Sequence, residues 1–432
     1  MTEIPPSRVF ASLPRRDQRH WAEVYLAGLA RAEGRKSVRT IAGAATPRGA
    51  GSVEQSLHQF IGNSPWDWGP VRRALARRLH AVLSPPPAAW VVRPLVIEKT
   101  GDRSVGVGRQ FVPGLGRTLN CQQANTVWLA APQGAFPVEW SLVLPPAWTE
   151  EAARRSVGLP DTARALTPTA DALRVVRRMA LGWGLPPLPV LWEPAAAELA
   201  GAVSTLLRHG PRFVLRIAPG TALLPEPPDR GRDRDRGPAD AAALLAAARV
   251  RRGSDGTHPV VSVRVRGPFG ERDGSRGPVL TLFGPADAAG GHWLTDLHRA
   301  GPGELARLTA LEDRAARDAA EVCEGLGLRD YEGRSHRGWH HHLTLVGVAH
   351  ANALLARIGP DGPASGRPSG PVEETRGEQR ERARTGPTGP PGRAPRGTRP
   401  PARTEGGAAP ASGARTGPCV PGTPCGGDPG ER

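Results

Sequence analysis

The chain has few cysteines and no long apolar stretch, and each of these absences removes a class of protein. Its 4 cysteines are scattered as Cys121, Cys323, Cys419 and Cys425, without the spacing of a disulfide framework or a zinc site. No segment approaches the roughly 18 consecutive apolar residues that span a bilayer. The amino terminus also has no apolar signal-peptide core. We therefore expect a cytoplasmic protein with no membrane partner.

What the sequence has in excess is positive charge. Its 432 residues include 57 Lys plus Arg against 41 Asp plus Glu, which gives a formal charge of +16 and a pI near 11.2. Such an excess attracts polyanions, and nucleic acid is the largest polyanion in a cell. A GC-rich genome that inflates Arg, Gly, Pro and Ala is an equal explanation. The composition alone therefore does not establish DNA binding.

The first 61 residues have the apolar spacing of three short helices, which we place at 17–32, 37–45 and 52–61. Ser52 is a suitable N-cap with Gln55 at the capping-box position. Three helices with a turn before the last favour a helix-turn-helix-like DNA-binding region, although a plain helical bundle has the same pattern. In the DNA-binding interpretation, the residues that face a groove are Gln55, His58 and Gln59.

A basic stripe follows in residues 64–83, where Pro70 marks the start of a further helix. A solvated helix face is the usual meaning of such a stripe, but its place directly before a predicted sheet favours contact with phosphates. The arginines of the stripe are Arg72, Arg73, Arg77 and Arg78.

The predicted sheet starts with β-branched and apolar residues from Val91 to Ile97, and this run ends at Glu98. A turn at Thr100 and Gly101 and a second β-rich run at 104–112 predict a hairpin. Glu98 would then lie where a buried strand ends and solvent begins.

Further strands are predicted at 123–131 and 137–144, followed by a helix at 163–182 and a short apolar strand at 188–192. This order is that of an RNase H-like domain. We therefore expect an α/β fold in which a mixed sheet is flanked by helices.

The rest of the chain adds an insertion, a long helix and a tail. Strands at 212–218 and 260–265 are assigned to a β-containing insertion at about 205–290, and a helix is predicted at 303–325. Residues from 359 onward have almost no large apolar side chains, so we expect a disordered tail. The expected regions are a helical DNA-binding region at 1–84, an RNase H-like domain at 89–357 and the tail at 358–432.

Several motifs give the chain a family resemblance. They are SVGVGRQF at 104–111, LNCQQANTVWLA at 119–130 and the closing LGLRDYEGRSHRGWHHH at 326–342. With these motifs the chain resembles the bacterial insertion-sequence transposases of the DDE type, specifically the seven-zero-one-like branch, over about residues 8–357. The resemblance implies DNA transposition as the activity, with binding of element ends, strand cleavage and strand transfer.

The resemblance also implies where the catalytic acids lie. Glu98 and Glu193 stand where the family has Asp, Ala316 stands in place of the third acid, and Cys323 replaces a Lys. Glu98 and Glu193 are then the expected ligands of Mg²⁺ or Mn²⁺. The third acid would be supplied from one turn earlier on the same helix face, by Glu312 or Asp313.

Two functions remain open. One is cut-and-paste transposition with these substitute acids; the other is a DNA-binding remnant or domesticated transposase without cleavage. Each Asp-to-Glu change moves a carboxylate by about one bond, and about 1 Å of misplacement can cost roughly a hundredfold in rate. The expected partners are the terminal inverted repeats of an element and a second copy of the chain, in the nucleoid, with further DNA contacts from Arg109 and Arg334.

The histidines at 336 and 340–342 are a second metal candidate. Adjacent histidines on a helix point in different directions, and neither Cys nor Asp completes a set with ligand spacing. We therefore expect packing or phosphate contact from these rings rather than zinc binding.

Overall fold

The computed structural model describes residues 4–46, 50–226, 237–248, 250–251, 260–267, 277–285 and 291–358. All of the described residues belong to one compact unit, Met1–Ala364. The predicted tail lies outside the described residues from 359 onward. Within the described part, no helix combines the length and apolar character needed to cross a membrane.

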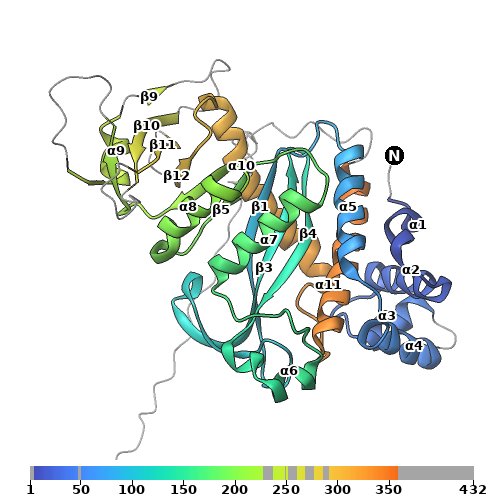
Figure 1. Cartoon of the computed structure of the whole chain (residues 1–432). Helices are drawn as coiled ribbons and strands as arrows, with labels where there is room; N and C mark the ends of the chain where they lie inside the picture. Colours follow the sequence, from blue (N-terminus) through green and yellow to red (C-terminus); the bar gives the residue numbers. More distant parts are fainter. Residues whose placement is uncertain are drawn as a thin grey trace, which may run out of the picture. The chain divides into compact units, whose positions relative to one another are not determined.

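Five strands form the core of the sheet. β3 (Arg117–Ala131) lies between β1 (Ala89–Glu98) and β4 (Gly134–Val143) and is antiparallel to both. On the other side of β1, β5 (Val190–Trp192) runs parallel to it, and β6 (Phe213–Ile217) runs parallel to β5. The order β4-β3-β1-β5-β6, with three antiparallel strands and then two parallel ones, is the RNase H-like arrangement that the sequence predicts (Figure 1).

The predicted first hairpin is wrong in its pairing. β1 is antiparallel to β3 along its whole length, while β2 (Gly108–Val112) pairs with the other side of β3. Two hydrogen bonds hold the intervening loop at Val105. The Val105 N–H donates to the Arg334 carbonyl, and the Val105 carbonyl accepts from the side-chain amide of Gln122. The turn at 99–107 is therefore a crossover between strands that are not neighbours.

Beyond β6 the sheet continues through antiparallel strands. β12 (His292–Thr295) pairs with β6, and the next neighbours are β11 (Val279–Pro285), β10 (Val260–Arg266) and β7 (Ala222–Pro225). The strand predicted at 212–218 is thus not part of an insertion; as β6 it is the fifth core strand. The smaller elements of this part are β8 (Ala239–Asp240), α9 (Ala241–Ala246) and β9 (Val250–Arg251).

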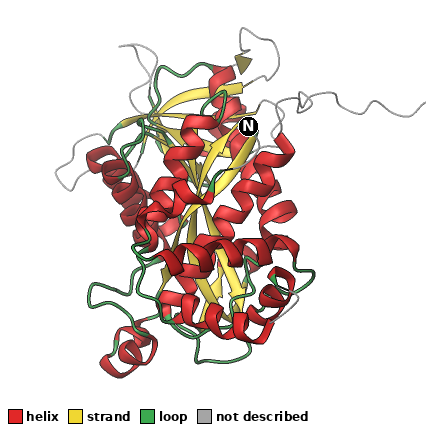
Figure 2. Cartoon of the chain, turned by 90° about the vertical axis from the view of Figure 1, so that its right-hand side faces the viewer, coloured by secondary structure: helices red, strands yellow, loops and turns green. Residues whose placement is uncertain are grey.

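Helices cover both faces of the core sheet (Figures 1 and 2). α7 (Pro168–Gly182) lies on one face, where the Asn125 side chain of β3 donates to Asp171 of α7 at 3.0 Å. α11 (His336–Ile358) lies on the other face, where Gly347 leaves room for the ring of Trp140. The remaining helices around the sheet are α6 (Glu151–Val157), α8 (Leu199–His209) and α10 (Pro302–Asp318).

α7 shows how the sequence specifies these helices. Thr167 caps it by accepting from the Ala170 N–H at 3.2 Å, and Pro168 occupies the first turn, where its missing N–H costs nothing. Its buried residues recur at helical spacing and include Val175, Val176 and Met179. The helix therefore turns one apolar stripe onto the sheet.

The helices predicted near the amino terminus are present. They are α2 (Arg16–Arg31), α3 (Val38–Ala45) and α4 (Ala50–Gly62), preceded by α1 (Pro6–Val9) and followed by α5 (Trp68–Val82). α2, α4 and α5 all pack against α11.

The histidines of α11 connect this helix to its neighbours. His342 donates from Nε2 to the Gly327 carbonyl and accepts from the Tyr25 hydroxyl of α2 at 2.8 Å. His341 lies between the carbonyls of Ile61 and Trp66. Groups of three or more His, Cys, Asp or Glu that could hold a metal are absent from the described residues. Packing, as the sequence indicated, accounts for these buried rings.

Arg72 of α5 is fully buried, so the prediction that it contacts DNA is wrong. Its guanidinium forms a buried ion pair with Glu139 of β4, donates to the Trp140 carbonyl at 3.0 Å and donates to Thr344 of α11 at 2.8 Å. Burial lowers the pKa of Arg72, and the charge of Glu139 opposes this shift. The residue joins α5, β4 and α11.

Replacement of Arg72 leaves Glu139 buried with one partner fewer, because only Arg178 continues to pair with it. We expect Arg72→Met to lower the free energy of unfolding by about 3–5 kcal/mol. The exposed neighbour Arg73 is the matched control, and Arg73→Met should change it by less than about 0.5 kcal/mol. Urea unfolding measures both; equal effects of the two substitutions would contradict the buried network.

Acid should destabilise the fold through its buried histidines. Burial lowers the pKa values of His342 and His350 to about 4, from an ordinary value of 6.5. Between these values the unfolded chain binds protons that the folded chain does not, so stability is complete above pH 6.5 and is lost as the pH falls toward 4. Each histidine contributes about 1.4 kcal/mol per pH unit in this window.

Urea unfolding between pH 7 and 4 measures this slope. His350 donates to the Ala135 carbonyl at 2.9 Å and is fully buried, whereas His58 is exposed. We expect His350→Gln to reduce the slope and His58→Gln to leave it unchanged. A free energy of unfolding that stays constant across this pH range would refute the assignment.

Candidate functional site

Glu98, the predicted first acid, lies at the exposed end of β1. Its side chain is 62% exposed and pairs with Arg117 at 3.3 Å. An exposed ion pair of this kind is worth little and leaves the carboxylate in water.

The register of the sheet separates Glu98 from Glu193. β1 and β5 pair in parallel with Val91 opposite Leu191, so two residues further along each strand Arg93 is level with Glu193. Glu98 lies five residues beyond Arg93 on β1, which at about 3.3 Å per residue is about 16 Å. An odd separation also turns its side chain to the opposite face. The expectation that Glu98 and Glu193 share a metal is therefore not met by the structure.

The other predicted acids lie on α10 and directly after β5. α10 packs across β1 and β5, and its Glu312 forms an ion pair with Arg216 of β6 at 3.4 Å. Burial raises the pKa of Glu312; Arg216 and Arg93 oppose the shift, while Glu193 and Asp313 add to it. The charges of Glu193 and Asp313 thus reach Glu312, and the catalytic role of all three acids stays a prediction.

The two positions on which the resemblance predicts a catalytic acid and a Lys are Ala316 and Cys323. Ala316 is half-buried one turn after Glu312. Cys323 is buried beyond the end of α10, where burial raises the pKa of its thiol. Asp318 cannot substitute as a ligand without loss of structure, because it accepts from the Ala135 N–H at 2.8 Å and from Arg314 at 3.0 Å.

Arg93 is the site residue that the sequence interpretation missed. It is half-buried on β1; burial lowers its pKa, and the charges of Glu312 and Asp313 oppose this shift. The signal was present in the run WVVRPLVI, where one charged residue interrupts a buried apolar strand. The β1 residue closest to the other acids is therefore a cation.

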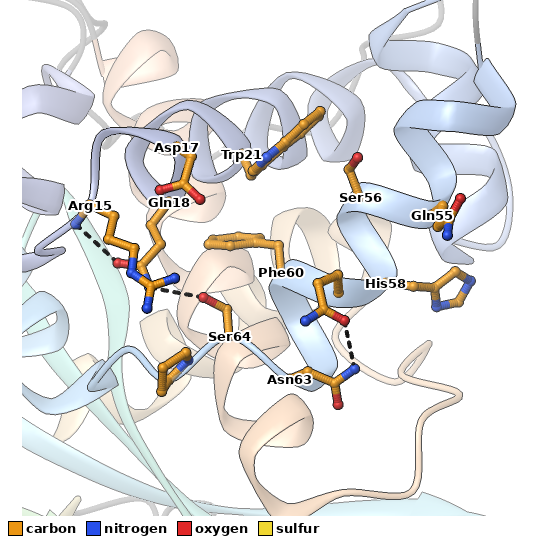
Figure 3. Close-up of a pocket in the computed structure, with 12 residues that line it drawn as sticks. Arg15, Asp17, Gln18, Trp21, Gln55, Ser56, His58, Phe60, Asn63 and Ser64 are labelled. Carbon is orange, nitrogen blue, oxygen red and sulfur yellow. Dashed lines mark hydrogen bonds between the residues drawn. The ribbon is translucent and has the colours of Figure 1, made fainter.

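A second feature is a groove of about 720 Å³ between α2 and α4 (Figure 3). Its walls are rich in side-chain amides: Gln18 donates to Ser64 at 2.9 Å and Asn63 donates to Gln59 at 2.9 Å. Trp21 of α2 also lines it. The three residues predicted to face DNA, Gln55, His58 and Gln59, are exposed and line this groove.

The other predicted DNA contacts occupy different settings. Arg73, Arg109 and Arg334 are exposed. Arg77 is exposed but donates to the Trp183 carbonyl at 2.7 Å, and Arg78 is half-buried. All five remain predictions as DNA ligands.

Comparison with protein families identifies the group to which the chain belongs. The family model described as DDE superfamily endonuclease matches residues 8–260, more than half of the 432 residues. The chain belongs to the DDE superfamily endonucleases. The match agrees with the RNase H-like strand order and includes β1, β5 and β6, whereas α10 follows the matched region. A comparison with curated proteins gave no match.

Membership implies DNA as the class of substrate, and endonucleases of this superfamily generally use divalent metal ions. The residues of this chain do not fit such an ion. Arg93, which carries a guanidinium, is level with Glu193 on the neighbouring strand β1, and Arg216 already pairs with Glu312. A hard divalent cation requires several carboxylate oxygens and is repelled by adjacent positive charge.

Proposed function

We propose that this protein binds DNA as a transposase-like member of its family and does not cleave it by metal-dependent chemistry. The observation that carries the proposal is the position of Arg93, level with Glu193 and within the electrostatic reach of Glu312 and Asp313. Two-metal cleavage places about four positive charges among carboxylates. At this site two guanidiniums balance part of the acid charge instead.

DNA binding rests on family membership and on surfaces outside this site. The groove between α2 and α4 presents side-chain amides, which can donate to and accept from base edges. Arg73 on α5 and Arg109 on β2 are exposed cations that suit phosphate contact. Terminal inverted repeats of an element are the proposed target, and a homodimer is the proposed binding form.

A second candidate is strand cleavage and transfer by an active enzyme. It is favoured by the charges of Glu193 and Asp313, which add to the burial-raised pKa of Glu312 and so indicate acids near it without Glu98. The two candidates make opposite predictions for the same assay.

In that assay the full chain is incubated with duplexes that carry candidate inverted repeats, in Mg²⁺ or Mn²⁺. We expect a shifted band in a binding gel and no strand nicking above the protein-free level. The reason is that the positive charge of Arg93 repels a divalent metal ion. Nicking that is lost in Glu193→Gln and Glu312→Gln, but retained in Glu98→Gln, would establish the enzyme and refute the proposal. Absence of any shifted band would remove the DNA-binding function.

The salt dependence of binding tests the basic stripe. Each lost phosphate contact should reduce the slope of log K against log salt by about 1. We expect this change for Arg73→Ala on α5. Arg155→Ala is the matched control, since Arg155 is an exposed arginine on α6 that pairs with Glu151 at 3.4 Å. Identical slopes for wild type and Arg73→Ala would exclude Arg73 as a phosphate ligand.

A further inference from the structure

The site at the carboxyl end of β5 has an unusual balance of charge. By the registers of β5 with its neighbours, Glu193 is level with Arg93 on β1 and with Arg216 on β6, and Glu312 of α10 pairs with Arg216 at 3.4 Å. Burial raises the pKa of Glu312, and the charges of Glu193 and Asp313 add to this shift. The two arginines come from strands on either side of β5, since β1 and β6 both pair with it. The cations are therefore held by the sheet itself.

Both guanidiniums are constrained. Arg216 donates to Glu312 at 3.4 Å, and its guanidinium lies 5.7 Å from the ring centre of Trp293. The backbone of Arg93 is fixed by pairing with β3, and its carbonyl also accepts from the Thr126 hydroxyl at 2.9 Å. The side chain of Arg93 is half-buried beneath α10, which packs on β1.

A cluster of uncompensated carboxylates repels the phosphates of DNA, and in metal-dependent members of the family a divalent ion removes that repulsion. Here the guanidiniums of Arg93 and Arg216, which are part of the chain, supply some of the positive charge that offsets the carboxylates. A guanidinium cannot dissociate, is not removed by a chelator, and keeps its charge at any ordinary pH.

We propose that Arg93 takes the place of the divalent ion at this site, so that DNA is held against the acid cluster in a metal-independent manner. The part of this inference that concerns DNA rests on the proposed function; the part that concerns the ion does not. Arg93 acts as a built-in counter-ion, and its replacement by an acid should uncover a latent metal site formed with Glu193 and Glu312.

The first experiment needs no DNA. Full-length protein is titrated with Mn²⁺ alone, and free Mn²⁺ is followed by its electron paramagnetic resonance signal. We expect the wild type to show no saturable Mn²⁺ binding that Glu193→Gln removes. Arg93→Asp should bind one additional Mn²⁺, and the double variant Arg93→Asp with Glu193→Gln should lose it. Arg109→Asp is the matched control, because it makes the same charge change at an exposed position on β2.

Two results overturn the inference. One is saturable Mn²⁺ binding by the wild type that is lost in a Glu193→Gln variant whose thermal unfolding remains cooperative. The other is a gain in Arg93→Asp no larger than that in Arg109→Asp, measured on variants whose thermal unfolding remains cooperative.

The second experiment measures DNA affinity in EDTA and in Mg²⁺ at matched ionic strength. Wild-type affinity should be the same in both. Arg93→Asp should bind about tenfold more weakly in EDTA, which corresponds to about 1.4 kcal/mol, and Mn²⁺ should restore its affinity. Chelator-sensitive binding by the wild type would refute metal independence. If the wild type binds no DNA, the proposed function fails, and the Mn²⁺ titration still decides the role of Arg93.

Discussion

The parallel pairing of β1 with β5 is the constraint on which the rest of the site depends. Continued by two residues, this register makes Arg93 of β1 level with Glu193, the first residue after β5. α10 then lies over the same strand ends and brings Glu312 and Asp313 to them. Strand pairing is set by backbone hydrogen bonds, and a slip of one residue would turn the apolar face of β1 to solvent. A small local shift of β1 therefore cannot bring Glu98 to the position of Arg93.

The strand order shows what periodicity could predict. Apolar runs at 137–144 and 188–192 placed β4 and β5 correctly, because a buried strand needs an apolar face wherever it pairs. Local sequence does not determine which strands pair. The short Gly-bearing turn after Glu98 therefore suggested a hairpin that the sheet does not contain. Glu312 and Asp313 of α10 were proposed because the resemblance marked position 316 and helix geometry puts both on the same face; their role stays a prediction. Arg93 was missed because its importance comes from the β1 to β5 register.

α11 gives the amino-terminal helices and the sheet a common support. Its histidines accept from or donate to groups on α2, on the α4 to α5 connection and on β4, namely Tyr25, Trp66 and Ala135. The sequence indicated packing for these rings but could not indicate their partners, which lie hundreds of residues away. Arg72 was misassigned for the related reason that an arginine stripe on a helix does not reveal which member turns inward.

The continuation of the sheet past β6 has a consequence for how two copies of the chain can meet. β6 is paired on one side with β5 and on the other with β12, so its backbone groups are already used. At the opposite end of the core, α5 packs against β4, and Arg72 donates to the Trp140 carbonyl there. A second copy therefore cannot lengthen the core by adding a strand to β6.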